Sequence, residues 1–212
     1  MDIKPHIKIQ QEANSAFMTA ASGQDNRSDE CEVKYLSLYD DMVQHSGVWF
    51  GEIFVSVQNH VFLEQSCGII GTLGSIQKKK GKFDKVQEII AVYTKVMNAY
   101  RDMVTNHLSN GINGHMFKAS MDSLTYKYDL LVSNTYQKLE EKEKCLPSFR
   151  RGVEYELKHN FSMEQQSLAF IIPGALGMND PRYEPLTLQK LRDVSDDKCW
   201  EALLIVNRFQ PS

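Results

Sequence analysis

An apolar stripe of helical period through residues 83–104 constrains the fold more than any other feature of the chain. Its members are spaced alternately three and four residues apart: Phe83, Val86, Ile90, Tyr93, Met97, Tyr100 and Val104. This spacing places the side chains on one face of an α-helix, and such a helix is stable only where that face is covered. We therefore expect a long helix that packs against other helices.

A second stripe of the same kind follows a predicted turn at residues 109–114, which read SNGING. Each Asn-Gly pair is a strong turn former, so the first long helix is expected to end there. The next apolar residues again recur at helical spacing: Phe117, Met121, Leu124, Tyr128, Leu131 and Leu139. Two long amphipathic helices separated by a short turn predict an antiparallel helical hairpin.

Shorter helical patterns account for most of the remaining chain. They predict helices over residues 8–21, 32–45, 148–160, 187–194 and 196–209. A capping-box pattern at residues 162–165 predicts one more helix, which the Pro-Gly pair at 173–174 would end. A loop is expected over residues 179–185.

Residues 48–65 carry two competing patterns. Phe50, Ile53 and Val61 fit the spacing of a helix, whereas Ile53, Val55 and Val57 alternate as they would in a strand. β-Branched and aromatic residues also suit a strand. A helix is favoured, because no matching second strand lies nearby in the sequence.

A lysine-rich stretch at residues 73–86 (LGSIQKKKGKFDKV) raises the question of phosphate binding. A P-loop needs four residues between its first glycine and its Gly-Lys pair, followed by a hydroxyl residue that holds magnesium. Here six residues separate Gly74 from Gly81, and Phe83 occupies the place of the hydroxyl. No apolar strand precedes the stretch either, so the sequence excludes a P-loop.

The same stretch contains a large residue followed by glycine, then a turn glycine followed two positions later by an aromatic residue. These are Leu73 with Gly74 and Gly81 with Phe83, and Ile70 suits the large position before them. In this register the stretch resembles one tetratricopeptide (TPR) repeat, a helical hairpin of about 34 residues.

The resemblance covers residues 67–100, with departures at Gln77, where an aromatic residue is usual, and Val86, where alanine is usual. It implies that stacked hairpins form a concave face for a peptide or helix of a partner. Some members of the family hold a C-terminal carboxylate with a lysine and an asparagine. Gly71 and Ser75 occupy those places here, so that clamp is absent.

The patterns together predict an all-α protein of antiparallel helical hairpins, arranged either as a TPR-like array or as a helical bundle. Residues 1–30 are expected to form an N-terminal segment with a short helix and a polar linker. Residues 31–212 are expected to form a single all-helical domain.

Five lysines against Asp84 give the predicted turn a local charge of +4: Lys78, Lys79, Lys80, Lys82 and Lys85. Lysines in the last turn of a helix complement its negative dipole end, so a solvated helix end is the favoured interpretation. The alternative is contact with an anionic partner, either a protein or a nucleic acid. The net charge of −3 provides no overall attraction to nucleic acid.

Glu156 and His159 form an E-x-x-H pair, which places a carboxylate and an imidazole on one helix face, as in di-iron bundles. Those sites need a second copy of the motif, and the chain has none. A surface ion pair is therefore favoured, and a metal is not expected. The HExxH, GxSxG and dinucleotide-binding motifs are also missing, so no catalytic residue and no cofactor are predicted.

Four cysteines are scattered along the chain without a C-x-x-C pair: Cys31, Cys67, Cys145 and Cys199. This distribution is typical of reduced, mostly buried thiols in an intracellular protein. No apolar run reaches the roughly 18 residues of a membrane span, and the first residues lack the apolar core of a secretory signal. A cytoplasmic location is expected.

These features favour a protein-binding module or scaffold that holds a peptide or helix of a partner on a helical-hairpin surface. A nucleic-acid-binding or assembly protein that uses the lysine-rich turn at 78–85 is the alternative. A helical-bundle metal protein or enzyme built around Glu156 and His159 is the third possibility, and an enzyme is less favoured than a binding protein.

Overall fold

The computed structural model describes residues 3–21, 29–51, 59–108, 111, 113–161, 168 and 187–209. Within these ranges the chain forms helices joined by short turns and contains no strand. The predicted all-α class is confirmed. The helix predicted to begin at residues 162–165 and the loop predicted over 179–185 lie outside the described residues.

The chain divides into two compact units, Met1–Thr125 and Tyr126–Ser212. The boundary falls within a single helix, α6 (Gly114–Lys138). Helix α1 (Lys4–Ala21), which lies in the predicted N-terminal segment 1–30, packs against α2 (Asp29–Gln44) and α4 (His60–Lys79) and so belongs to the first unit. The apolar face of α1, which includes the fully buried Ala13, accounts for this packing.

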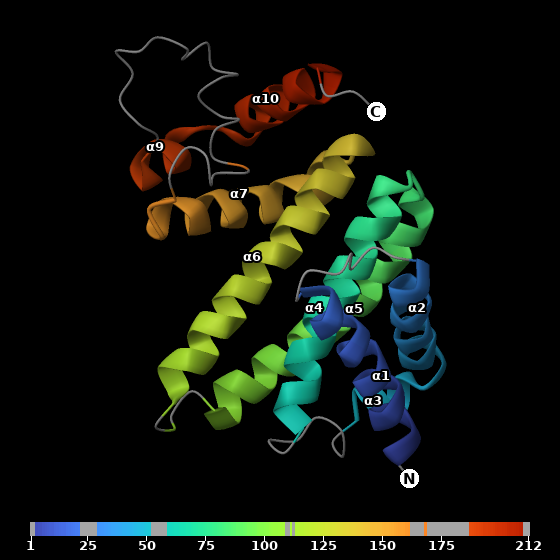
Figure 1. Cartoon of the computed structure of the whole chain (residues 1–212). Helices are drawn as coiled ribbons and strands as arrows, with labels where there is room; N and C mark the ends of the chain where they lie inside the picture. Colours follow the sequence, from blue (N-terminus) through green and yellow to red (C-terminus); the bar gives the residue numbers. More distant parts are fainter. Residues whose placement is uncertain are drawn as a thin grey trace. The chain divides into compact units, whose positions relative to one another are not determined.

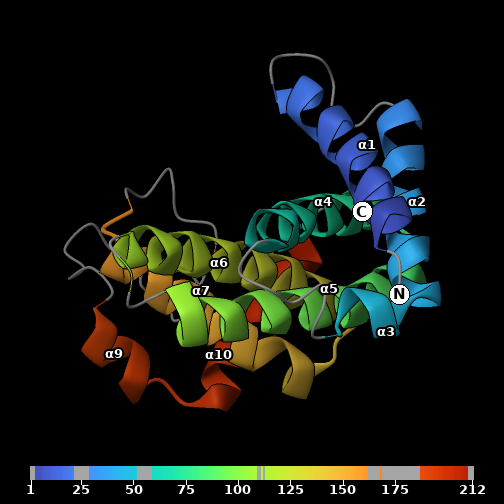
Figure 2. The same ribbon diagram turned by 90° about the horizontal axis from the view of Figure 1, so that it is seen from below.

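The first unit is built around a hairpin of two long helices (Figure 1). The hairpin consists of α4 (His60–Lys79) and α5 (Phe83–Met103), and α5 is followed by a π-helical segment, Val104–Leu108. Helices α2 (Asp29–Gln44) and α3 (Ser46–Trp49) precede the hairpin. Helices α4 and α5 lie side by side in both views (Figures 1 and 2). Gly81 makes the turn between them with φ of 69°, a left-handed conformation that favours glycine.

The predicted apolar stripe faces the interior of this unit. Val86 and Tyr100 are 0% exposed, and the intervening stripe residues are almost as deeply buried. The ambiguous segment 48–65 is helical at both of its described ends, in α3 and at the start of α4. Its residues 52–58, which carry the strand-like alternation, lie outside the described residues.

The two helices of the hairpin approach closely where Tyr93 of α5 lies against Gly71 of α4. A Cβ atom at Gly71 would lie 3.0 Å from the Tyr93 ring. Ile70 and Leu73, on either side of this glycine in the sequence, are 0% exposed. The small residue therefore lets an aromatic ring lie directly against the backbone of the neighbouring helix.

The second unit contains the end of α6 together with α7 (Lys142–Lys158), α9 (Leu188–Asp193) and α10 (Asp196–Phe209). Helix α7 packs against both α9 and α10. It begins six residues before the predicted start at 148, so Pro147 lies inside it. Pro147 is the sixth residue of the helix and lies beyond its first turn, so its missing N–H removes one helical hydrogen bond there.

Two arginines of α7 form hydrogen bonds and ion pairs with other helices of the second unit. Arg150 donates to Asp196 Oδ1 (2.7 Å) and to the carbonyl oxygens of Leu191 (3.0 Å) and Val194 (2.6 Å), and thereby joins α7 to the connection between α9 and α10. Arg151 Nη2 lies 2.7 Å from Oδ1 of Asp129 on α6, a carboxylate that is 1% exposed. A buried carboxylate needs such a partner, because an isolated charge in the interior is strongly unfavourable.

All four cysteines lie in the described part of the chain, and none forms a disulfide. Cys67, Cys145 and Cys199 are buried, whereas Cys31 is partly exposed. Burial raises the pKa of all three buried thiols, that of Cys145 to about 12. No helix among the described residues is both long and apolar enough to span a lipid bilayer.

Candidate functional site

The lysine-rich turn is partly occupied by contacts within the protein. Lys80 Nζ lies 2.5 Å from Glu32 Oε2, and Gln77 Nε2 donates to Glu32 Oε1 at 2.7 Å. Glu32 lies in the first turn of α2 and is only 7% exposed. The hydrogen bond from Lys80, assisted by that from Gln77, holds the pKa of Glu32 below its ordinary value. These contacts join the end of α4 to α2.

Lys85 is engaged in a similar way at the start of α5. Its Nζ atom donates to Glu88 at 3.0 Å and lies 4.3 Å from the centre of the Tyr39 ring, which belongs to α2. The contact combines an ion pair with a cation–π interaction. Lys79 and Lys82 are exposed, and Lys78 is partly buried. The structure thus does not bring the five lysines together as one uniform binding surface.

The residues that carry the TPR resemblance occupy packing positions in the hairpin. Ile70, Leu73 and Gly74 are buried in α4, Gly81 forms the turn, and Phe83 is half-buried at the first position of α5. Their arrangement agrees with the hairpin that the resemblance implies. Membership of the repeat family remains a prediction.

Glu156 is not at the surface, contrary to the expected surface ion pair. It is 0% exposed and accepts hydrogen bonds from the Tyr126 hydroxyl (2.6 Å) and from the Leu168 backbone N–H, which is 3.1 Å from both carboxylate oxygens. A Cβ at Gly152 would lie 2.5 Å from Leu168 Cδ1, so this glycine makes room for that side chain. His159 is exposed, and its ring lies 4.1 Å from that of Tyr155.

A cluster that the sequence reasoning missed joins α1 to α2 in the first unit. His6 Nδ1 lies 2.8 Å from Asp41 Oδ2, and His45 Nδ1 lies 3.0 Å from Asp41 Oδ1. The indole N–H of Trp49 in α3 donates to Asp41 Oδ2 at 2.8 Å. We call His6, Asp41 and His45 the His–Asp–His cluster.

Helix geometry and packing explain how these three side chains meet. Asp41 lies in the last turn of α2, and His45 follows the end of that helix, where its N–H still donates to the Asp41 carbonyl oxygen (2.9 Å) and keeps the two side chains on the same side. His6 reaches them from α1, and its ring lies 4.9 Å from that of His45 and 6.4 Å from that of Trp49. His6 and Asp41 are each 8% exposed, whereas His45 is exposed. The D-x-x-x-H spacing was the only signal of this cluster visible in the sequence.

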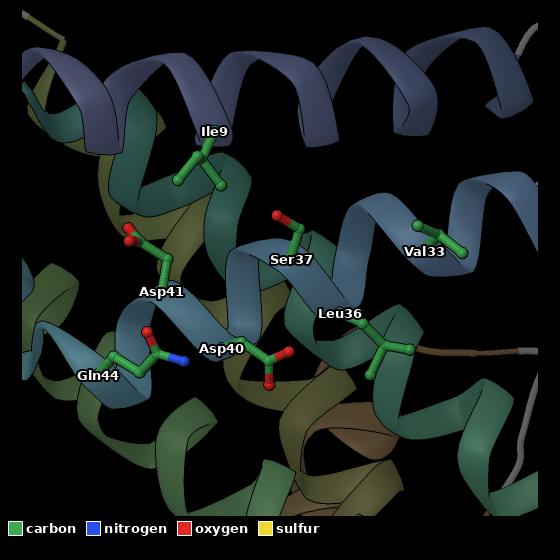
Figure 3. Close-up of a pocket in the computed structure, with 7 residues that line it drawn as sticks. All are labelled: Ile9, Val33, Leu36, Ser37, Asp40, Asp41 and Gln44. Atoms are coloured by element: carbon green, nitrogen blue, oxygen red, sulfur yellow. The ribbon is translucent and has the colours of Figure 1, made fainter.

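A groove adjoins the cluster on the surface of α2 (Figure 3). It has a volume of about 480 Å³ and is lined by Ile9, Val33, Leu36, Ser37, Asp40, Asp41 and Gln44. Ile9 extends from α1 toward α2, while Ser37 and Asp41 extend from α2 toward α1 (Figure 3). None of these lining residues is basic. We call this the α2 groove.

The α2 groove combines apolar and acidic character. Val33 is 63% exposed, which leaves its apolar surface available for contact. Asp40 is also exposed, whereas Asp41 is held by the histidines and Trp49. A ligand with apolar groups beside a positive charge would complement this surface.

The chain matches no protein-family model, no curated protein and no solved structure.

Proposed function

We propose that the protein is a binding module whose first unit holds a basic, amphipathic segment of a partner protein in the α2 groove. The observation that carries this proposal is the groove itself, which exposes apolar side chains next to an acidic one and contains no basic lining residue. Grooves of this kind bind amphipathic helices through apolar anchors.

The spacing of the lining residues suits a helical ligand. Val33, Leu36, Asp40 and Gln44 recur every three or four residues and so form a stripe along α2. A partner helix would place apolar residues against Val33 and Leu36, and a lysine or arginine beside Asp40. Charge complementarity of this type mainly sets specificity and the rate of association.

Two further expectations are part of this proposal. We propose that the α4–α5 hairpin is TPR-like, in agreement with its Gly81 turn and with the burial of Leu73 and Gly74. We also propose a cytosolic location, because scattered cysteines without disulfides suit a reducing compartment. The alternative function, nucleic-acid binding at the lysine-rich turn, is supported by the exposure of Lys79 and Lys82.

The proposal is tested by selecting ligands from a displayed library of random helical peptides against the full chain. We expect the selected peptides to share apolar residues at helical spacing and at least one basic residue. Binding to the selected peptides is then measured for Val33→Asp and Asp40→Lys, which alter the groove, and for Val43→Asp. Val43 is 50% exposed on the same helix but does not line the groove, so it provides a matched control.

Loss of affinity in both groove variants, with binding retained by Val43→Asp, would support the proposal. Peptides that bind all three variants as tightly as they bind the original chain would overturn it. Selection of acidic peptides that depend on Lys79 and Lys82 would instead favour the lysine-rich turn as the binding surface.

A further inference from the structure

The His–Asp–His cluster has the composition of a metal site as well as that of a hydrogen-bonded anchor. Its three ligand atoms, one from each side chain, all lie within 4.8 Å of one another. Two imidazoles and one carboxylate form a donor set that suits divalent transition metals, and zinc in particular. We propose that His6, Asp41 and His45 bind a divalent transition-metal ion of the zinc class.

The distance from each imidazole to the carboxylate is close to the spacing of ligand atoms that zinc requires. In a tetrahedral site with bonds of about 2.0–2.1 Å, neighbouring ligand atoms lie about 3.3 Å apart. The Nδ1 atoms of His6 and His45 lie 2.8 Å and 3.0 Å from the Asp41 oxygens. The two imidazoles contact different oxygens of Asp41, and the three ligand atoms span up to 4.8 Å, so side-chain shifts of up to about 1.5 Å would gather them around one ion. The ion would replace the proton between each imidazole and the carboxylate.

The surroundings of the cluster fix its orientation. The Trp49 N–H donates to Asp41 Oδ2 at 2.8 Å, and hydrogen bonds of this kind hold ligating carboxylates in place. Asp41 and His6 are nearly buried, so their side chains have few alternative positions. Of the three ligands only His45 is exposed, so an ion would enter from the solvent on the His45 side of the cluster.

Three protein ligands leave a fourth tetrahedral position for water or for a group from another molecule. The ion would also connect α1 to the end of α2, because His6 lies on α1, Asp41 lies in the last turn of α2 and His45 directly follows that helix. Metal binding would therefore stabilise the packing of α1. Asp41 also lines the α2 groove, so the two sites share one residue.

The experiment uses the full chain after removal of metals with a chelator. Zn²⁺ binding is measured by calorimetry, Co²⁺ binding by the visible absorption of tetrahedral cobalt, and the thermal midpoint is recorded with and without Zn²⁺. The main variant is His45→Ala, because an exposed side chain can be removed without opening the core. His6→Gln is the second variant, and His107→Ala and His115→Ala remove other exposed histidines as controls.

We expect one Zn²⁺ per chain, a tetrahedral Co²⁺ spectrum, and a thermal midpoint that rises with Zn²⁺. His45→Ala and His6→Gln should each weaken Zn²⁺ binding at least tenfold and abolish the cobalt spectrum, while both control variants behave like the original chain. The proposal is overturned if the chain binds no Zn²⁺, or if His45→Ala binds it as tightly as the original chain. The cluster would then be a hydrogen-bonded anchor alone.

Discussion

Lys80 and Glu32, which are 48 residues apart in the sequence, form an ion pair that fastens the end of α4 to the first turn of α2. The carboxylate is nearly buried, and the ammonium group is partly exposed. A basic residue that the sequence placed at a solvated helix end therefore has a defined partner within the protein. This pairing makes stability depend on pH.

We predict that Glu32→Gln removes part of the acid dependence of unfolding. The folded-state pKa of Glu32 lies below its ordinary value of 4.5, chiefly because Lys80 donates a hydrogen bond to it. A carboxyl group whose pKa is lowered by folding stabilises the folded state at pH values above its ordinary pKa. That stabilisation is lost as the pH falls through the lowered pKa. At neutral pH, the free energy of unfolding measured with urea should thus be lower for Glu32→Gln than for the original chain.

The difference should shrink as the pH falls below 4.5. Glu30→Gln is a suitable control, because Glu30 lies in the same helical turn and is exposed. It loses the same favourable interaction with the helix dipole without breaking the buried contact. Equal losses of stability in the two variants would contradict the prediction.

A second prediction concerns the close approach of Tyr93 to Gly71. Gly71→Ala would place a methyl group 3.0 Å from the Tyr93 ring, and overpacking of this kind typically costs about 1–3 kcal/mol. The same substitution at Gly68, also in α4, would place its Cβ 3.6 Å from the Phe17 ring, an ordinary contact. Gly68→Ala should therefore be neutral or stabilise by up to about 1 kcal/mol, because alanine favours the helix.

Denaturant midpoints of the two alanine variants provide the measurement. Gly71→Ala should cost less stability in a chain that already carries Tyr93→Leu than in the original chain, since the ring that clashes with the new methyl group is then absent. If Gly71→Ala and Gly68→Ala have the same effect, the ring does not lie against the α4 backbone in solution.

The third prediction separates the structural lysines from the exposed ones. Replacing Lys79 and Lys82 by glutamine should leave the free energy of unfolding nearly unchanged, because both side chains are exposed. Lys80→Gln should lower it, because it leaves the nearly buried Glu32 without its cation. Urea unfolding of the double and single variants compares the two effects.

The same double variant tests nucleic-acid binding. If Lys79 and Lys82 contact phosphates, the slope of log affinity against log salt should fall by roughly 1.8 for duplex DNA. An unchanged slope, or the absence of measurable affinity in the original chain, would exclude these two lysines as a nucleic-acid site.

The fourth prediction concerns Arg150 in the second unit. Arg150→Ala removes donors to Asp196 and to the backbone carbonyls of Leu191 and Val194. Charge-assisted hydrogen bonds of this type contribute about 1.5–3 kcal/mol, so the connection between α9 and α10 should open more readily. Faster hydrogen exchange in residues 188–209, compared with Arg192→Ala at an exposed position, would show this.

The parts of the fold that depend on local pattern were predictable from sequence. The stripe from Phe83 to Val104 predicted the length and buried face of α5, and Gly81 predicted its turn, because both signals lie within one hairpin. The sequence pattern predicts a helix from residue 148, whereas α7 begins at Lys142. Packing of the buried Cys145 and Leu146 favours the helical turns before Pro147, and such tertiary contacts outweigh a local helix-breaking signal.

The candidate sites depend on contacts that no local pattern records. His6 is 35 residues from Asp41, and only the packing of α1 on α2 brings them together. The sequence predicts a surface ion pair for Glu156, because its E-x-x-H motif has no second copy that would complete a metal site. Its partners, Tyr126 and Leu168, come from other parts of the chain and are visible only in the folded structure.

Each of the two units contains at least one buried cysteine, whose reaction with an alkylating reagent would measure how often that unit opens. Cys67 lies beneath the side chains of the first unit, and Cys145 and Cys199 lie within the second. Their raised pKa values and burial protect these thiols from alkylating reagents until the surrounding helices separate. Mass spectrometry of alkylated peptides over time would thus yield two opening rates from one sample, and equal rates would mean that both units unfold in a single cooperative event.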